Sequence, residues 1–361
     1  MTVFSTEDHQ WMSQALRLAA QGLRTTSPNP RVGCLLVRDG QLVGSGWHQR
    51  AGEPHAEVYA LAAAGERAAG ATAYVTLEPC SHHGRTPPCA DALIAAGVRR
   101  VVAAMTDPNP LVAGRGLQRL ADAGIQVEHG LLASEAAELN KGFILRMVAG
   151  RPWVTVKLGA SLDGKTALSD GRSQWITGPA ARADVQALRA RSCAILTGSG
   201  TVAADNPRLT VRDFAVARQP LRVVVEGVMC ADSADREIFS DGGATLLACA
   251  LPHPAHQARL QAQGVRVQVL PAANNPAKVD LAALLQQLGR EGINEVLVEA
   301  GMSLNGALLH AELVDELVLY LAPVTLGHDS RGLFSIPPLP GLEQAQRWRW
   351  HDISRVGDDI R

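Results

Sequence analysis

Residues 55–57 read H-A-E, residues 76–80 read T-L-E-P-C, and residues 81–89 read S-H-H-G-R-T-P-P-C. One histidine and two cysteines of this stretch, His55, Cys80 and Cys89, offer the nitrogen and sulfur donors that zinc prefers. Three protein ligands leave a fourth tetrahedral position for water, which is typical of a catalytic zinc, whereas a structural zinc uses four protein ligands. The stretch therefore predicts a zinc-dependent hydrolytic site.

Glu57 lies two residues after His55 and is the candidate general acid-base of this site. Residues two apart do not share a face within a regular helix, so we expect His55 and Glu57 where a helix begins after Pro54. Pro87-Pro88 favours a first helical turn, which places Cys89 where unpaired N–H groups and the helix dipole stabilise a thiolate. The metal is therefore expected between two helix N-termini.

H-x-E followed by P-C and a second Cys is the pattern of zinc nucleobase deaminases, in which activated water displaces ammonia from an amidine carbon. The usual two-residue gap between the cysteines is here eight residues, 81–88. With that gap, P-C-S-H-H-G-R-T-P-P-C resembles the deaminase half of the bifunctional riboflavin-biosynthesis deaminase-reductases. The resemblance implies that the long loop helps to hold a phosphoribosylaminopyrimidine substrate. It also implies that Asn29, which by itself fits a turn, lies close to the base.

The composition favours an ordinary globular protein that acts on a small molecule. Of the 361 residues 47% are apolar, and 34 basic and 35 acidic side chains leave a net charge of -1. This length favours two domains, and this charge provides no broad basic surface for nucleic acid. The N-terminus has no signal-peptide pattern and no apolar run approaches the roughly 18 residues of a membrane span, so we expect a cytoplasmic protein without a membrane partner. The six cysteines follow no framework spacing, which favours metal binding by one pair and free thiols elsewhere.

Strand and helix patterns alternate on both sides of a turn-rich segment, A-G-R-P at 149–152. Before this turn, a first helix capped by Ser5 and Asp8 precedes strands at 32–37, 42–47, 72–77, 98–105 and 125–128 and helices at 57–69, 90–96, 116–123 and 134–147. After it we expect strands at 153–158, 194–197, 222–225, 244–248, 265–270, 295–299 and 316–321, with helices at 179–191 and 280–290. The alternation predicts two α/β domains, residues 1–149 and 150–361.

The second domain lacks a G-x-G-x-x-G after any strand, which argues against an ordinary dinucleotide fold. Instead, residues 298–306, V-E-A-G-M-S-L-N-G, place glycines and a helix start after a buried strand. This arrangement suits a phosphate but is also that of a plain strand-turn-helix junction. It resembles the reductase half of the same family together with four further motifs: K-L-G-A-S-L-D-G-K-T at 157–166, S-Q-W-I-T at 173–177, L-R-A at 188–190 and T-V-A-A-D-N-P-R-L-T-V-R at 201–212.

The resemblance thus covers nearly the whole chain and implies an N-terminal cytidine-deaminase-like α/β/α sandwich and a C-terminal dihydrofolate-reductase-like α/β domain that uses NADPH. Carried over by position, the NADPH site comprises Ala160, Trp175, Thr201, Asp205, Gly301, Met302, Ser303, Leu304, Asn305, Gly306 and Ala307. The reductase substrate contacts are Ser173, Arg189, Leu209, Arg212 and Glu299. Without the resemblance, Trp175 fits core packing and Arg189 a solvated helix face. The family carries a further strand after a G-x-D element, and because only two residues follow Asp359 here, we expect that strand to be incomplete.

The sequence therefore predicts a two-step enzyme of riboflavin synthesis. Zinc-activated hydroxide removes the 2-amino group of diamino-hydroxy-phosphoribosylaminopyrimidine, and NADPH then reduces the ribosyl group to ribityl at C1′. One alternative is a nucleic-acid deaminase of the tRNA type with an appended nucleotide-binding domain, which the neutral charge and the cysteine gap disfavour. The other is a non-catalytic zinc or nucleotide-binding module, which Glu57 disfavours. We expect a homodimer, the commonest assembly.

Overall fold

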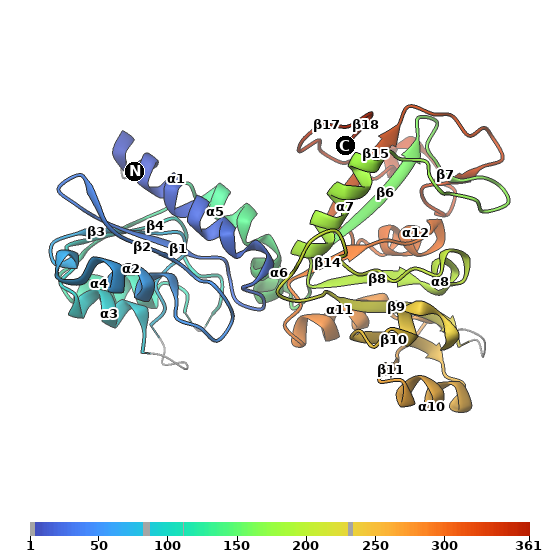
Figure 1. Cartoon of the computed structure of the whole chain (residues 1–361), viewed down its shortest axis with the longest axis horizontal. Coiled ribbons are helices and arrows are strands. Elements are labelled where there is room, and N and C mark those ends of the chain that lie inside the picture. The colour runs from blue at the N-terminus through green and yellow to red at the C-terminus, as the bar shows by residue number, and fades with distance from the viewer. Residues whose placement is uncertain (1–3, 82–86, 111, 230–233) are drawn as a thin grey trace. The chain divides into compact units, whose positions relative to one another are not determined.

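The chain folds into two compact units, Met1–Gly150 and Arg151–Arg361, which are divided one residue beyond the boundary expected from the sequence (Figure 1). The computed structural model describes residues 4–81, 87–110, 112–229 and 234–361. Within these ranges no helix has the length and apolar character needed to cross a membrane.

Unit 1 is a five-stranded sheet covered by helices on both faces. Its order is β2-β1-β3-β4-β5, with β1 antiparallel to β2 and β3 and the other pairs parallel. The strands are β1 Gly33–Arg38, β2 Gln41–Trp47, β3 Thr72–Val75, β4 Arg100–Ala103 and β5 Gln126–His129. The helices are α1 Thr6–Ala20, α2 Ala56–Ala64, α3 Cys89–Ala95, α4 Arg115–Asp122, α5 Ala133–Leu139 and α6 Lys141–Ala149.

The two faces of this sheet have separate cores. Helices α1 and α5 lie on one face and α2, α3 and α4 on the other (Figure 1). Their side chains form two separate buried clusters with those of the strands. Two glycines of β2 allow α2 to lie directly on the sheet: a Cβ added to Gly44 would lie 2.3 Å from the carbonyl oxygen of Ala60, and one added to Gly46 would lie 2.4 Å from that of Ala56. The small alanine side chains of α2 and the glycines of β2 thus allow the helix to pack closely on the sheet, and this packing positions the first turn of α2.

The prediction of a single helix at 134–147 is wrong. The chain instead forms two helices, α5 and α6, on either side of Asn140. The side-chain oxygen of Asn140 accepts a hydrogen bond from the backbone N–H of Arg31 (2.8 Å), and its amide donates to the Arg31 carbonyl (3.0 Å). Arg31 is 109 residues away, so the helical pattern gave no sign of this break.

Unit 2 is built on a nine-stranded sheet with the order β11-β10-β9-β8-β14-β6-β15-β18-β17. The strands from β11 to β15 run parallel, and β18 and β17 add an antiparallel edge. The sheet strands are β6 Trp153–Ser161, β8 Ala194–Gly198, β9 Leu221–Val228, β10 Thr245–Leu251, β11 Arg266–Val269, β14 Glu295–Val298, β15 Glu316–Ala322, β17 Arg355–Val356 and β18 Asp359–Ile360. Short pairs outside the sheet are β7 Lys165–Ala167 with β16 Arg331–Gly332, and β12 Pro271–Ala272 with β13 Asn275–Val279.

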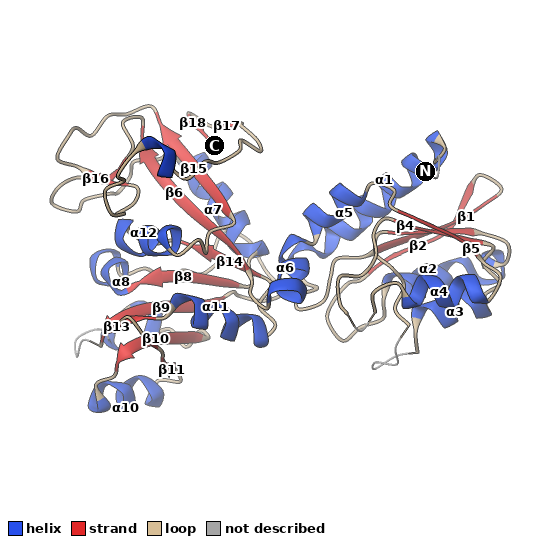
Figure 2. Ribbon diagram, turned by 180° about the vertical axis from the view of Figure 1, so that it is seen from behind, coloured by secondary structure: helices blue, strands red, loops and turns tan. Residues whose placement is uncertain are grey.

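Helices again cover both faces of the sheet. Figure 2 shows helices of this unit on both sides of the sheet. One core contains side chains of α11 and α12, and the other contains side chains of α7, α9 and α10. The helices of this unit are α7 Pro179–Arg191, α8 Ser199–Asp205, α9 Glu237–Ser240, α10 Pro254–Ala262, α11 Leu281–Arg290 and α12 Met302–His310. All strands and both helices expected in this half are present, which confirms the predicted α/β alternation.

Candidate zinc and cofactor sites

The three predicted zinc ligands meet in unit 1. The Nδ1 atom of His55 lies 3.6 Å from Sγ of Cys80 and 3.3 Å from Sγ of Cys89. Zinc bonds of normal length at tetrahedral angles separate nitrogen and sulfur by roughly 3.5 Å. In the part of the chain that the structure describes, these residues form the one group of three potential ligands whose donor atoms lie within 4.8 Å of one another. The donor set and its spacing both fit zinc.

Helix starts position these ligands as the sequence predicted. His55 is the N-cap of α2 and Cys89 is the first residue of α3. The backbone N–H of Cys89 donates to Sγ of Cys80 at 3.3 Å, so the positive end of α3 also favours thiolate at Cys80. Glu57 lies in the first turn of α2 and is 3% exposed. Burial raises the pKa of Glu57 to about 7, against the opposing effect of His55.

His48, which the sequence analysis did not select, holds the candidate substrate residue Asn29. Nδ1 of His48 lies 3.1 Å from the Pro54 carbonyl oxygen, and Nε2 lies 3.0 Å from Nδ2 of Asn29. A carbonyl oxygen only accepts and an amide nitrogen only donates, so Nδ1 carries the proton and Nε2 accepts from Asn29. The bond fixes which way the Asn29 amide faces. The signal was a histidine seven residues before His55, too generic to single out.

Glu78, in T-L-E-P-C, ties the loop after β3, which carries Cys80, to the segment after β4. Its carboxylate, 3% exposed, accepts hydrogen bonds at 2.8–3.4 Å from the backbone N–H groups of Asp107, Gly114, Gly116 and Leu117. A Cβ on Gly116 would lie 1.9 Å from the Pro79 carbonyl oxygen, so the two segments are in direct contact. The glutamate therefore supports a metal ligand without being one. Residues 82–86, in the loop expected to hold the deaminase substrate, lie outside the described residues.

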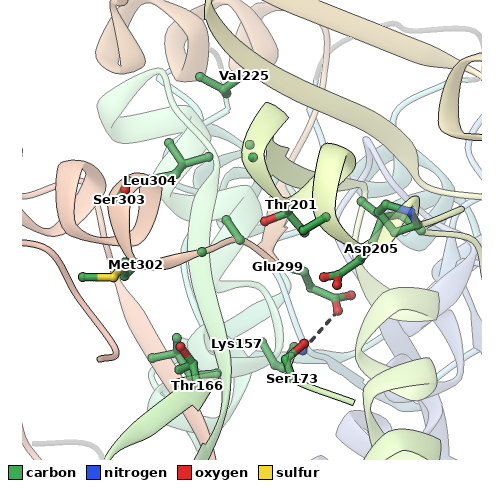
Figure 3. A pocket seen from close by; sticks show the side chains of 18 of the residues that line it. Lys157, Thr166, Ser173, Thr201, Asp205, Val225, Glu299, Met302, Ser303 and Leu304 are labelled. Carbon is green, nitrogen blue, oxygen red and sulfur yellow. Dashed lines mark ion pairs between the residues drawn. The ribbon is translucent and has the colours of Figure 1, made fainter. Parts of the chain in front are cut away.

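Unit 2 contains a cavity of about 1290 Å³ at the carboxyl ends of β8 and β14 (Figure 3). Ligands of open α/β sheets bind at this edge. The N-termini of two helices, α8 and α12, contribute Thr201, Gly301, Met302 and Ser303 to its lining. The cavity is also lined by the other predicted cofactor and substrate residues except Asn29, Ala160, Asn305 and Gly306: Ser173, Trp175, Arg189, Asp205, Leu209, Arg212, Glu299, Leu304 and Ala307.

Three predicted cofactor residues are buried behind this lining. Ala160 is 0% exposed on β6. Asn305 is also buried, and its amide donates to the Ala300 carbonyl oxygen at 2.9 Å. A Cβ on Gly306 would lie 2.1 Å from the Ser335 carbonyl oxygen. The last two residues thus shape the start of α12.

A buried charge cluster forms the floor of the cavity. Glu299 accepts from Nε of Arg189 at 2.6 Å and pairs with Nζ of Lys157 at 3.1 Å, as Figure 3 shows for Lys157. Burial alone raises the pKa of Glu299, but the two cations outweigh it and hold the value at about 2. The sequence predicts no role for Lys157, the first residue of K-L-G-A-S-L-D-G-K-T, because spacing along the chain does not show that it meets Glu299.

The environments of Trp175 and Arg189 differ from those expected from their residue types alone, which were core packing for Trp175 and a solvated helix face for Arg189. Trp175 is 69% exposed at the cavity and the Arg182 guanidinium stacks 4.7 Å from the ring centroid, so it is not core packing. Arg189 is 11% exposed and donates to Glu299 and to the Thr210 carbonyl oxygen (3.1 Å), so it is not on a solvated face. By contrast, Arg212 is exposed at the cavity.

Comparison with known proteins finds a match for each of the two units. The model of the cytidine and deoxycytidylate deaminase zinc-binding region matches residues 5–105, and that of the RibD C-terminal domain matches residues 152–361. The chain is 54% identical to the riboflavin biosynthesis protein RibD of Escherichia coli over 98% of both chains. Among solved structures, Acinetobacter baumannii RibD superposes with a TM-score of 0.90 at 44% identity, covering 98% of this chain and 97% of that one. A Thermotoga maritima diaminohydroxyphosphoribosylaminopyrimidine deaminase/5-amino-6-(5-phosphoribosylamino)uracil reductase has a TM-score of 0.85 at 30% identity and the same coverage.

Proposed function

The chain belongs to the RibD family of bifunctional riboflavin-biosynthesis deaminase-reductases, and we propose that its two sites act in turn on one pyrimidine ribose-phosphate. The substrates are those named for the Thermotoga maritima relative. Unit 1 replaces the 2-amino group of diaminohydroxyphosphoribosylaminopyrimidine with oxygen, and unit 2 reduces the product. Family membership over both units leaves no support for the nucleic-acid deaminase or the non-catalytic module.

In unit 1, His55, Cys80 and Cys89 hold zinc, and Glu57 moves the protons. Zinc held by these residues would activate a water molecule for attack. The Glu57 carboxylate would take a proton from the attacking water and deliver it to the departing amine, while the second water proton ends on the adjacent ring nitrogen, so that the ring carbon becomes a carbonyl and the amine leaves as ammonia. Asn29, oriented by His48, binds the base. Burial of Glu57 excludes competing bulk water from these transfers.

In unit 2, bound NADPH supplies the hydride for C1′ of the ribosyl group. Thr201 and Ser303, in the first turns of α8 and α12, face the cavity, and these helix N-termini suit the cofactor phosphates. Reduction also breaks the bond from C1′ to the ring oxygen, which must gain a proton. We assign this donation to Lys157, the ammonium beside Glu299.

The substrate phosphate is assigned to Arg212, and Arg189 serves the substrate by holding Glu299. Two nitrogens of Arg189 are bonded to Glu299 and a third to a backbone carbonyl oxygen, whereas Arg212 is exposed at the cavity. Ser173 and Leu209 complete the substrate contacts, and Trp175 and Asp205 the NADPH contacts.

The observation that carries this proposal is the presence of both preformed sites in a chain that matches whole RibD proteins. We expect the purified protein to release ammonia from the diaminopyrimidine without NADPH, and to oxidise NADPH once the deaminated product has formed. Two results would contradict the assignment. One is ammonia release that depends on NADPH, and the other is reduction of the diaminopyrimidine as fast as that of the deaminated product. The homodimer and the cytoplasmic location remain predictions, and light scattering measures the first.

A further inference from the structure

The helix that carries Arg189 begins without a capping side chain of its own. Its N-cap is Gly178, whose backbone N–H donates at 2.7 Å to Oδ2 of Asp359, a residue 181 positions later. Asp359 is 1% exposed. A carboxylate at a helix N-terminus satisfies an otherwise unpaired N–H and interacts favourably with the helix dipole. The cap of α7 is therefore supplied by the C-terminal strand.

The C-terminal segment holds α7 at a second point. Asp184, one turn and a half into the helix, accepts from the hydroxyl of Tyr320 on β15 (2.6 Å) and from Nη1 of Arg361 (3.0 Å). Between these points, Gly357 has a φ of +66°, and a Cβ there would lie 2.8 Å from Cβ of Ala180. Strand β18 is itself held by its pairing with β15. The short antiparallel edge thus fastens α7 to the sheet.

Gly178 is also the junction between two sets of cavity residues. Immediately before it lies the segment 173–177, with Ser173 and Trp175 at the cavity. Immediately after it, Arg182 stacks on Trp175 and donates at 2.7 Å to the Thr177 carbonyl oxygen. Further along α7, Arg189 holds Glu299. A shift of this junction would displace the proposed NADPH contact Trp175 and the proposed substrate contact Ser173 together.

We propose that Asp359 is a positioning residue of the reductase: by capping α7 it holds the segment 173–177, with Ser173 and Trp175, in the arrangement that binds substrate and NADPH. The inference rests on the proposed reductase function of unit 2. Asp359 touches no reacting atom. We therefore expect it to affect the binding of NADPH and substrate more than the chemical step.

The test compares Asp359→Ala with Asp359→Asn and with the adjacent control Asp358→Ala in the full chain. The amide of Asn can still accept from Gly178, whereas Ala cannot; Asp358 is 90% exposed and lies 3.8 Å from Arg355. Reductase kinetics are measured with the deaminated pyrimidine, and ammonia release reports on unit 1. We expect Asp359→Ala to raise KM for both NADPH and pyrimidine about tenfold, Asp359→Asn to restore most of this, and Asp358→Ala to behave as wild type. If the alanine variant does not fold, Asp359→Ser, too short to reach Gly178, replaces it.

Hydrogen–deuterium exchange separates this inference from the proposed function. Removing the cap should speed exchange in peptides spanning 173–182, whether or not the cavity proves to reduce the pyrimidine. A wild type that never oxidises NADPH would overturn the proposed function while this measurement still decides the role of the cap. A lower kcat with unchanged KM values would overturn the positioning role, because a merely structural residue changes only the amount of folded enzyme. Unchanged hydrogen exchange at 173–182 in Asp359→Ala would overturn it as well.

Discussion

Glu57 lies beside the metal ligands because it is the second residue of α2, which begins directly after the N-cap His55. His55 closes the turn before α2 and Glu57 lies one residue inside the helix, so the carboxylate is buried beside the ligands without joining them. The same pair two residues apart in the middle of a helix would face different directions.

Glu57→Gln should therefore keep zinc and lose deamination. The amide preserves size but cannot carry the proton from water to the leaving amine, so we expect ammonia release to fall by about 100- to 10,000-fold. Zinc content by atomic absorption and NADPH oxidation with the deaminated product should match wild type. A loss of metal that parallels the loss of activity would instead make Glu57 a ligand.

The two arginines of the reductase cavity should respond differently to removal. Arg212→Ala should raise KM for the pyrimidine roughly tenfold or more with little change in kcat, because it loses a charge-assisted contact to phosphate. Arg189→Ala should lower kcat, because Glu299 and Lys157 lose the partner that fixes their geometry.

Arg290→Ala, on the exposed side of α11 with Gln287 as its partner, is the control for loss of an arginine. If Arg189→Ala changes only KM while Arg212→Ala changes neither constant, the phosphate contact belongs to Arg189.

At the scale of elements, α1 is tied to the sheet of unit 1 through Asp8. Its carboxylate completes a capping box with Ser5, accepts from the Tyr74 hydroxyl at 2.7 Å and pairs with Arg100 at 2.6 Å. Burial alone raises the pKa of Asp8, but Arg100, Ser5 and Tyr74 together hold it well below its usual range.

Because the folded-state pKa is depressed, this contribution is present above the unfolded value of about 3.9 and is lost as pH falls below it. Asp8→Asn should cost about 1.5–3 kcal/mol of unfolding free energy for unit 1 at pH 7, and the difference from wild type should shrink at pH 3. Hydrogen exchange of unit 1 peptides in increasing urea measures it. Asp39→Asn, at a 91% exposed hairpin carboxylate, is the control, and an Asp8 effect independent of pH would exclude a charge contribution.

What the sequence could predict at this scale was local. The helices predicted at 179–191 and 280–290 lie within one residue of the observed bounds of α7 and α11, and in the structure Asp280 is the N-cap of α11. The break at Asn140, the cap of α7 by Asp359 and the Lys157–Glu299 pair were not predictable by spacing, because each joins residues more than 100 positions apart. Apart from the glycine-rich strand-turn-helix at 298–306, the positions in the reductase cavity were predicted only through the family resemblance, because the ends of several strands bring them together.

At the scale of the whole molecule, the two activities have separate requirements. Among the described residues the metal-ligand cluster lies in unit 1, and the reductase cavity is lined by residues of unit 2. Its hydride comes from NADPH, and its charges are satisfied by side chains of that unit. The binding of zinc is therefore expected to govern one reaction and not the other.

Zinc removal by a chelator should abolish ammonia release from the diaminopyrimidine and leave NADPH oxidation with the deaminated product within about twofold of wild type. Zinc added back should restore deamination, which separates metal loss from unfolding. Cys80→Ser should reproduce the chelated enzyme, because a neutral hydroxyl replaces a thiolate ligand. Thermal unfolding of both samples shows whether unit 1 also needs the metal for stability. A parallel fall in both activities on chelation, with both units still folded, would mean that reduction depends on the metal, and the assignment of independent sites to the two units would then be wrong.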